Sequence, residues 1–249
     1  MRKVQAAMTQ NIYDDAGFFQ NYSALPRSRE GLAGAPEWPA LRALVPDLRG
    51  RRVVDLGCGF GWFARWAREE GAASVLGLDV SRNMLTRARD MSTDEALHFE
   101  QADLEQLSLP QAGFDFAYSA LALHYVEHIT RVFAVLHRAL TPGARLVFSV
   151  EHPAYTAPRA PDWIRDAAGR ESWPLDGYLE EGPRVTDWLA PGVMKQHRTL
   201  GTWLNTLIDC GFAIRHVEEW GPTRAQVAAR PEWARERERP MFLLIAAQR

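Results

Sequence analysis

The stretch 53–61, VVDLGCGFG, decides the fold. A short apolar run leads directly into three closely spaced glycines, and apolar residues at helical spacing follow as far as Gly71. This order of strand, glycine turn and helix is typical of the first unit of a parallel sheet, where ligands bind beyond the carboxyl ends of the strands. Gly57 and Gly59 allow close approach of the backbone, and the helix that follows presents free N–H groups. We therefore expect an anionic or strongly accepting ligand group at this turn.

The alternation of strands and helices continues along the chain. Strands are predicted at 51–56, 74–78, 97–101, 114–121 and 144–150, and helices over 81–91 and 129–140, the latter ended by 141–143. The fifth strand is a continuous apolar run, which indicates burial on both faces. A helix over 200–210, with Ile208 on its predicted apolar face, and two closing strands at 212–219 and 241–247 complete the pattern. The sequence predicts an α/β, Rossmann-like fold with helices on both faces of a mostly parallel sheet.

We expect a single domain with an embellishment. The segment 151–198 interrupts the alternation with six prolines and three tryptophans, and we interpret it as a lid over the substrate. The expected parts are an N-terminal cap (1–50), a ligand-binding core (51–150), the lid (151–198) and a closing helix and strands (199–249). No stretch has the length and apolar character of a signal peptide or a membrane span, so a cytoplasmic protein without membrane contact is expected.

The composition limits the possible partners. Hydrophobic residues make up 47% of the 249 residues and charged residues 24%, as in an ordinary globular protein. The formal net charge of -2 gives no general attraction to a phosphate backbone, so nucleic acid is not an expected partner. Cys58 and Cys210 belong to no CxxC or Cys/His cluster, which indicates reduced thiols and no metal site.

Two acidic residues follow neighbouring strands of the predicted sheet. Asp79 ends the second strand about twenty residues beyond the glycines, the spacing at which a carboxylate meets the ribose hydroxyls of a nucleotide. Asp103 follows the third strand, where its side chain is placed to accept a hydrogen bond from an adenine amine. The glycine turn and both carboxylates therefore predict a nucleoside site at one edge of the sheet.

These segments together resemble class I S-adenosylmethionine (SAM) dependent methyltransferases, specifically the bacterial small-molecule type called methyltransferase type 11. VVDLGCGFG is similar to the family's first motif, VLGLDVS to its ribose-binding strand end, and QADLEQLSLP to its adenine-binding turn. FDFAYSALALHYV resembles the fourth strand and the wall beside the methyl group, and LTPGARLVFSV the fifth strand. The resemblance covers about 13–146 and, more loosely, the rest of the chain.

The resemblance implies seven strands, with the last one antiparallel and inserted beside the fifth. It implies SAM as cofactor, S-adenosylhomocysteine as product and a small-molecule acceptor methylated on O, N or C. The stretch 13–28 resembles the family's helical cap, in which Arg27 would pair with the methionyl carboxylate. The implied cofactor-binding residues are Tyr22, Arg27, Asp55, Gly57, Cys58, Gly59, Asp79, Val80, Met84, Ala102, Asp103, Leu104, Ala120 and His124.

Two alternatives remain open. A nicotinamide-dependent oxidoreductase would share the fold, but its Gly-x-Gly-x-x-Gly fingerprint places the third glycine one residue later than Gly61, and Asp55 stands where the methyltransferase pattern has an acid. The other alternative is a protein that binds SAM without turnover. Measuring SAM affinity and turnover separately would distinguish it.

Methyl transfer from a sulfonium is a direct displacement, so positioning is the main task, and a base is needed only if the acceptor arrives protonated. His152 is the first candidate, because EHPAY places it after the fifth strand, beside Tyr155 and the lid. His197 at the end of the lid is the second candidate, although its neighbours can simply cap the next helix. His124 is expected to pack against the cofactor. The sequence leaves open whether the chain is a monomer or a homodimer.

Overall fold

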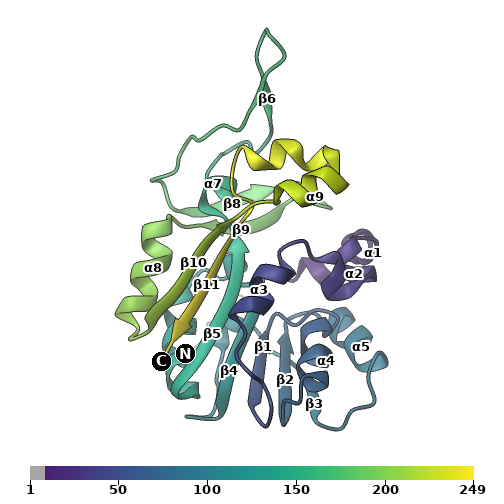
Figure 1. Cartoon of the computed structure of the whole chain (residues 1–249), viewed down its shortest axis with the longest axis vertical. Coiled ribbons are helices and arrows are strands. Elements are labelled where there is room, and N and C mark those ends of the chain that lie inside the picture. The colour runs from purple at the N-terminus through teal and green to yellow at the C-terminus, as the bar shows by residue number, and fades with distance from the viewer. Residues whose placement is uncertain (1–8) are drawn as a thin grey trace, which may run out of the picture.

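A seven-stranded sheet runs through the molecule (Figure 1). The structure is a computed structural model that describes residues 9–249, so the first eight residues of the expected cap lie outside the described residues. The strand order is β10-β11-β5-β4-β1-β2-β3, and β11 alone is antiparallel to its neighbours. The strands are β1 Arg52–Leu56, β2 Ser74–Asp79, β3 Leu97–Gln101, β4 Phe114–Ala120, β5 Leu140–Glu151, β10 Ala213–Trp220 and β11 Phe242–Gln248. The predicted Rossmann-like sheet with an antiparallel last strand is confirmed.

Helices cover both faces of the sheet. On one face α6 and α8 pack with Val54 and Leu56 of β1, and on the other face α3, α4 and α5 pack with Val53. Neighbouring residues of β1 are thus buried on opposite sides, because side chains alternate along a strand and both faces are covered. These helices are α3 Trp38–Leu44, α4 Trp62–Glu69, α5 Arg82–Asp90, α6 Ile129–Ala139 and α8 Leu200–Asp209.

The boundary between α6 and β5 differs from the prediction. The residues 141–143, expected to separate helix from strand, belong to β5, which begins at Leu140. Phe114 of β4 pairs with Leu140, and Phe116 pairs with Arg145, so the register shifts between these pairs. Such an irregularity accommodates a proline and a glycine within a strand. The strand continues one residue beyond the predicted end, to Glu151.

The apolar face predicted for the helix over 200–210 is too wide. Trp203 and Leu207 of α8 are buried, but the Ile208 side chain is 54% exposed. Ile208 follows Leu207 directly, and adjacent residues of a helix do not share a face. The buried stripe of α8 therefore ends at Leu207.

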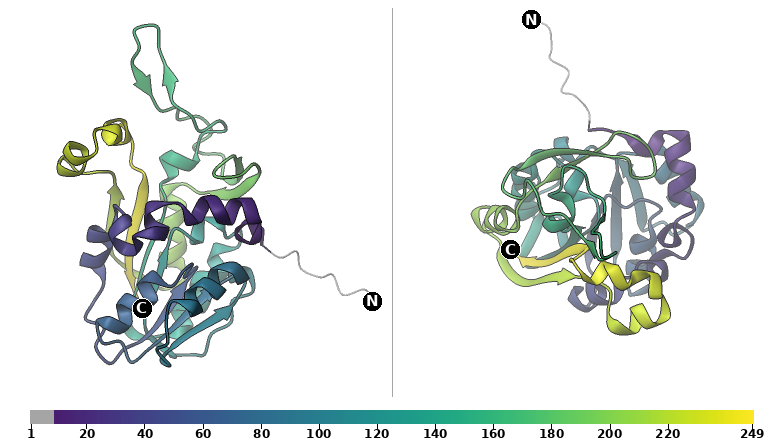
Figure 2. Two further views of the ribbon diagram at one scale, coloured as in Figure 1. Left: turned by 90° about the vertical axis from the view of Figure 1, so that its right-hand side faces the viewer. Right: turned by 90° about the horizontal axis from the view of Figure 1, so that it is seen from above.

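The N-terminal segment and the segment 151–198 lie at the carboxyl ends of the parallel strands. The first consists of η1 Ile12–Asp14, α1 Ala16–Ser23, α2 Pro26–Arg29 and η2 Gly31–Gly34, ahead of α3. The second segment without Glu151, which belongs to β5, is here called the insertion (152–198). It contains α7 Pro153–Thr156 and the strands β6 Ile164–Arg165, β7 Glu171–Ser172, β8 Gly182–Thr186 and β9 Val193–His197. The β6–β7 hairpin projects away from the rest of the molecule (Figures 1 and 2).

The connection between the closing strands also lies at this end of the sheet. It forms α9 Arg224–Ala229 and η5 Pro231–Arg237, beside the base of the projecting hairpin (Figure 1). Arg239 links this connection to the insertion, because its guanidinium lies 4.1 Å from the centre of the Trp173 ring and 4.5 Å from that of the Tyr155 ring. Within residues 9–249, no helix combines the length and apolar character that crossing a membrane requires.

Candidate active site

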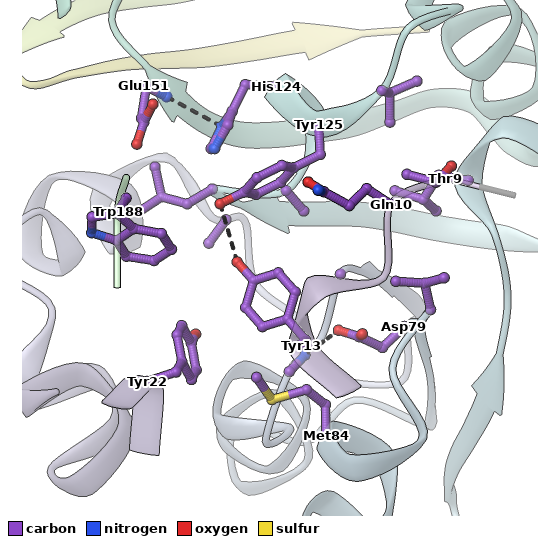
Figure 3. A pocket seen from close by; sticks show the side chains of 18 of the residues that line it. Thr9, Gln10, Tyr13, Tyr22, Asp79, Met84, His124, Tyr125, Glu151 and Trp188 are labelled. Atoms are coloured by element: carbon purple, nitrogen blue, oxygen red, sulfur yellow. Dashed lines mark hydrogen bonds between the residues drawn. The ribbon is translucent and has the colours of Figure 1, made fainter. Parts of the chain in front are cut away.

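A cavity of about 330 Å³ opens at the carboxyl ends of β1, β2 and β4 (Figure 3). The sheet side of its wall holds Gly57, Gly59, Asp79, Val80, Met84, Asp103, Leu104, Ala120 and His124, all predicted cofactor residues. The N-terminal segment contributes Tyr13, Tyr22 and Arg27, and the insertion contributes Tyr155 and Trp188. The structure thus brings eleven of the fourteen predicted cofactor residues, and Tyr155, to one space.

The glycine turn after β1 has the backbone that only glycine adopts readily. Gly57, Gly59 and Gly61 have φ of 71°, 52° and 69°, in the left-handed region. A Cβ on Gly57 would lie 2.3 Å from the Cβ of Ala122, far inside van der Waals contact. Gly57 is therefore required for the close packing of this turn against the end of β4.

Asp79 ties the glycine turn to the end of β2. Its carboxylate accepts hydrogen bonds from the backbone N–H groups of Gly59 and Ser81, each at 2.9 Å. Burial raises the pKa of Asp79 to about 6, although these two backbone bonds oppose the shift. The carboxylate is thus fixed in position at the cavity wall, and it changes charge close to neutral pH.

A smaller cavity of about 100 Å³ lies behind the glycine turn and shares Tyr22 and Arg27 with the first. Asp55 and Cys58 line this smaller cavity and are absent from the wall of the first. The Oδ2 atom of Asp55 is buried and has no hydrogen-bond partner among residues 9–249. Burial, and secondarily Asp79, raises the pKa of Asp55 well above its ordinary value. A buried acceptor without a partner is costly unless a ligand donates to it.

Arg27 has a protein partner that the sequence analysis did not foresee. Its guanidinium forms a salt bridge of 3.1 Å with the buried carboxylate of Glu37. Glu37 and the expected ligand carboxylate would therefore both bind the guanidinium of Arg27. A guanidinium has five N–H donors, so the ion pair leaves donors for a ligand.

Asp103 is held by the start of the described chain. One oxygen of its carboxylate accepts from the Thr9 hydroxyl at 2.6 Å and the other from the Thr9 backbone N–H at 3.1 Å. The Glu105 backbone N–H donates to the same carboxylate at 3.0 Å. Ala102, also predicted to bind cofactor, does not line the cavity; its N–H donates to the Asp79 carbonyl at 2.9 Å.

His124, Tyr13 and Tyr125 bring further polar groups to the cavity (Figure 3). The backbone N–H of Glu151 donates to Nδ1 of His124 at 3.4 Å, and the hydroxyls of Tyr13 and Tyr125 lie 3.2 Å apart. Burial lowers the pKa of His124 to about 4, so its imidazole is neutral at physiological pH. Burial also raises the pKa of Tyr155 to about 12, which keeps its hydroxyl protonated.

His152, predicted to lie beside the acceptor, is not among the residues that line the cavity. Its Nδ1 accepts from the Ala154 backbone N–H at 2.9 Å and caps α7, and its Nε2 lies 2.8 Å from Glu219. Both ring nitrogens are therefore engaged within the protein. Burial lowers the pKa of His152, while Glu219 opposes the shift.

His197 is also distant from the cavity wall. Its Nδ1 lies 2.8 Å from the Thr156 hydroxyl and its Nε2 2.9 Å from the Tyr178 carbonyl. The imidazole is completely buried and joins β9 to α7 and to the loop that precedes β8. Both ring nitrogens of His197, the second candidate base, therefore have partners within the protein.

The sequence analysis missed several residues at the cavity. Glu151 directly follows a predicted buried strand, the same signal that identified Asp79, and was overlooked because it was counted as the first residue of the lid. Trp188 belongs to a segment without regular periodicity, so nothing in the sequence placed it. The other overlooked wall residues are Thr9, Gln10, Tyr13, Leu25, Leu121, Ala122, Tyr125, Val126, Met241 and Phe242.

Comparison with known proteins identifies the family. Residues 54–148 match the family model described as a methyltransferase domain. The chain is 62% identical to an S-adenosylmethionine dependent methyltransferase from Mesorhizobium loti, whose crystal structure covers 88% of this chain and 100% of its own at a TM-score of 0.85. The chain belongs to the SAM-dependent methyltransferases. SAM is therefore the cofactor of this methyltransferase, and the nicotinamide-dependent alternative is not retained.

Two relatives with named activities match this methyltransferase over part of their length. The malonyl-[acyl-carrier protein] O-methyltransferase of Enterobacter lignolyticus is 38% identical over 110 residues, 44% of this chain and 43% of the relative. The trans-aconitate 2-methyltransferase of Deinococcus radiodurans is 41% identical over 115 residues, 46% of this chain and 42% of the relative. Each match spans less than half of the relative.

Proposed function

We propose that this methyltransferase transfers the methyl group of SAM to a small-molecule acceptor held between the sheet edge and the insertion. One observation carries the proposal: a single cavity is lined both by the glycine turn with Asp79 and by Tyr155 and Trp188 of the insertion. A donor on the sheet side and an acceptor under the insertion would therefore share one enclosed space. A cavity of this kind suits a small ligand better than a macromolecular surface.

The residues at the sheet edge fit SAM. The unpartnered carboxylate oxygen of Asp55 suits the donors of the methionyl amino group, and the donors that Glu37 leaves on Arg27 suit the methionyl carboxylate. Asp79 would accept hydrogen bonds from the ribose hydroxyls. Asp103 and Leu104 border the position expected for the adenine, although Thr9 already donates to Asp103.

SAM supplies an electrophilic methyl group on a sulfonium, so the protein has mainly to orient the acceptor and exclude water. Holding reactants in line contributes several kcal/mol, roughly 7 to 11 at best. Tyr13, Tyr22 and Tyr125 present aromatic surface to the cavity, and such rings attract a cation. Neutral His124 and protonated Tyr155 supply polar groups without placing a full charge beside the acceptor.

The acceptor cannot be carried over from the relatives. The two relatives are named for different acceptors, one of them attached to a carrier protein. The family model ends at residue 148, whereas the insertion that walls the acceptor side begins after Glu151. The small-molecule class therefore rests on the cavity of this chain.

The proposal is tested by following a labelled methyl group. Full-length protein is incubated with methyl-labelled SAM and a bacterial extract separated into small-molecule and macromolecular fractions. We expect label in the small-molecule fraction together with S-adenosylhomocysteine, and less label with the Asp79→Ala variant at the same SAM concentration. Label confined to proteins or nucleic acids, or no transfer to either fraction, would contradict the proposal.

A further inference from the structure

A second cavity of about 530 Å³ lies within the insertion and meets the first one at a shared wall. Glu151, Tyr155 and Trp188 line both cavities, and Lys195 lines the second. Glu151 ends β5, whereas Lys195 lies on β9 and Trp188 precedes that strand. The wall therefore consists of one residue from the core and a set supplied by the insertion, next to the cavity that we assign to the methyl donor.

A buried ion pair between Glu151 and Lys195 lies at this shared wall. Arg159, Asp162, Arg184 and Asp187 also line the second cavity, where Arg159 pairs with Glu180 and Arg184 donates to the carbonyl of Ala157. The Lys195 ammonium lies 2.5 Å from Oε1 of Glu151, and their side chains are 3% and 13% exposed. The ammonium also lies 4.9 Å from the centre of the Trp188 ring, a favourable position for a cation. Lys195 is thus neutralised by Glu151 and stabilised by Trp188, so it is not available as a free cation for an anionic ligand.

Glu151 has unused capacity to accept hydrogen bonds. A carboxylate accepts about four hydrogen bonds, but within residues 9–249 Oε2 of Glu151 is buried and has no partner. Leaving such an acceptor unpaired is costly. Its carboxylate lies on the same side of the cavity as Trp188 and His124 (Figure 3). The missing partner is a hydrogen-bond donor, and the neighbouring Tyr155 and Trp188 rings provide flat apolar surface for the rest of the molecule.

We infer that the acceptor is an uncharged aromatic compound whose nucleophile carries an N–H or O–H, and that Glu151 binds this group. The inference rests on the proposed function and deepens it. A carboxylate acceptor would face the Glu151 carboxylate at short range, where like charges are poorly screened. It would also find the Lys195 ammonium already paired.

This arrangement assigns Glu151 a proton-accepting role. A lone pair of the acceptor forms the bond to the methyl carbon, the bond from that carbon to sulfur breaks, and its electron pair stays on sulfur. The proton of the acceptor's N–H or O–H passes to the Glu151 carboxylate and later to solvent. Lys195 acts as a positioning residue, because it binds one oxygen of the Glu151 carboxylate and leaves the other oxygen for the acceptor.

Equilibrium binding tests the inference without knowledge of the natural acceptor. The probes are 2-naphthol and 2-naphthoate. Both contain a naphthalene ring, but 2-naphthol carries a neutral hydroxyl donor and 2-naphthoate carries a carboxylate. Calorimetry is performed on the full chain saturated with S-adenosylhomocysteine. We expect the wild-type protein to bind 2-naphthol at least about tenfold more tightly than 2-naphthoate, a difference of about 1.4 kcal/mol.

The variant Glu151→Gln should reverse this preference, because it removes the negative charge and leaves Lys195 free to pair with the naphthoate carboxylate. Glu171→Gln is the matched control: it removes the same charge from the insertion, in the β6–β7 hairpin, where Glu171 pairs with Arg165 and neither residue lines either cavity. We expect the control to keep the wild-type preference.

Equal affinity for the two probes in the wild-type protein, tighter binding of 2-naphthoate, or binding of neither would overturn the inference. The wild-type comparison remains decisive even if Glu151→Gln does not fold. SAM affinity and transfer of label to small molecules are measured on the same preparation. If both are normal while the probe preference is absent, the inference fails alone; if transfer to small molecules is absent, the proposed function fails.

Discussion

The carboxylate of Asp79 accepts a hydrogen bond from the backbone N–H of Gly59 at 2.9 Å, so the acid that ends β2 braces the turn that follows β1. The two residues are 20 positions apart in the sequence and line the same cavity. The Asp79 side chain thus fixes the turn, and its carboxylate can still accept further hydrogen bonds from the ligand.

Replacing Asp79 with alanine should weaken SAM binding. Hydrogen bonds to a charged group contribute about 1.5–3 kcal/mol, so we expect the dissociation constant to rise roughly ten- to hundredfold. Calorimetric titration with SAM measures the change. Asp47→Ala is the control, because that carboxylate pairs with Arg49 on the surface. An unchanged affinity of the Asp79 variant would remove Asp79 from the cofactor site.

SAM affinity should also depend on pH through Asp79. Its pKa is raised from 3.8 to about 6, so lowering the pH through 6 protonates the folded carboxyl group and should weaken binding. The linkage to stability has the opposite sign: the folded state retains the proton more tightly, so this contribution is present below pH 3.8 and lost as the pH rises through about 6. Titrations at several pH values test this, and Asp79→Asn should flatten the dependence.

Gly57→Ala should destabilise the protein more than Gly50→Ala. Both glycines have φ of +71°, but a Cβ on Gly57 would lie 2.3 Å from that of Ala122, whereas one on Gly50 would meet nothing within 4 Å. Each variant should lose about 1–2 kcal/mol for the left-handed backbone, and Gly57→Ala should lose more from the clash. Urea unfolding measures both variants. Equal losses would show that the turn relaxes freely.

His152→Ala should lower stability and leave SAM affinity unchanged. The imidazole caps α7 and contacts Glu219, and loss of a helix cap costs about 0.5–2 kcal/mol. Urea unfolding and SAM titration of the same variant separate the two effects. A large loss of turnover in the folded variant would restore His152 as a catalytic candidate.

The strands and the sheet edge were predictable because their signals are local. Residues 53–56 of β1 and 146–150 of β5 are buried, so both stretches are mainly apolar and end at the edge of the sheet that borders the cavity. The same rule placed Asp79 and Asp103 at the cavity, and it also applies to Glu151, which was assigned to the lid instead.

The roles of particular side chains were not predictable, because their partners are distant in sequence. Thr9, which holds Asp103, is 94 residues away from it, and Glu219, which holds His152, is 67 residues away. A histidine that follows a strand has the same sequence pattern whether it faces a ligand or caps a helix. Only the folded chain shows that His152 does not line the cavity.

Strand β5 is hydrogen-bonded to β4 on one edge and to β11 on the other, and its pairing with β11 extends to Glu151, opposite Phe242. A strand that is hydrogen-bonded on both edges cannot shift its register. Glu151, after which the insertion begins, is therefore fixed relative to the methyl donor. The insertion beyond Glu151 can change its shape without changing the distance between Glu151 and the methyl donor. A methyltransferase built in this way can evolve specificity for a new acceptor through changes in the insertion alone.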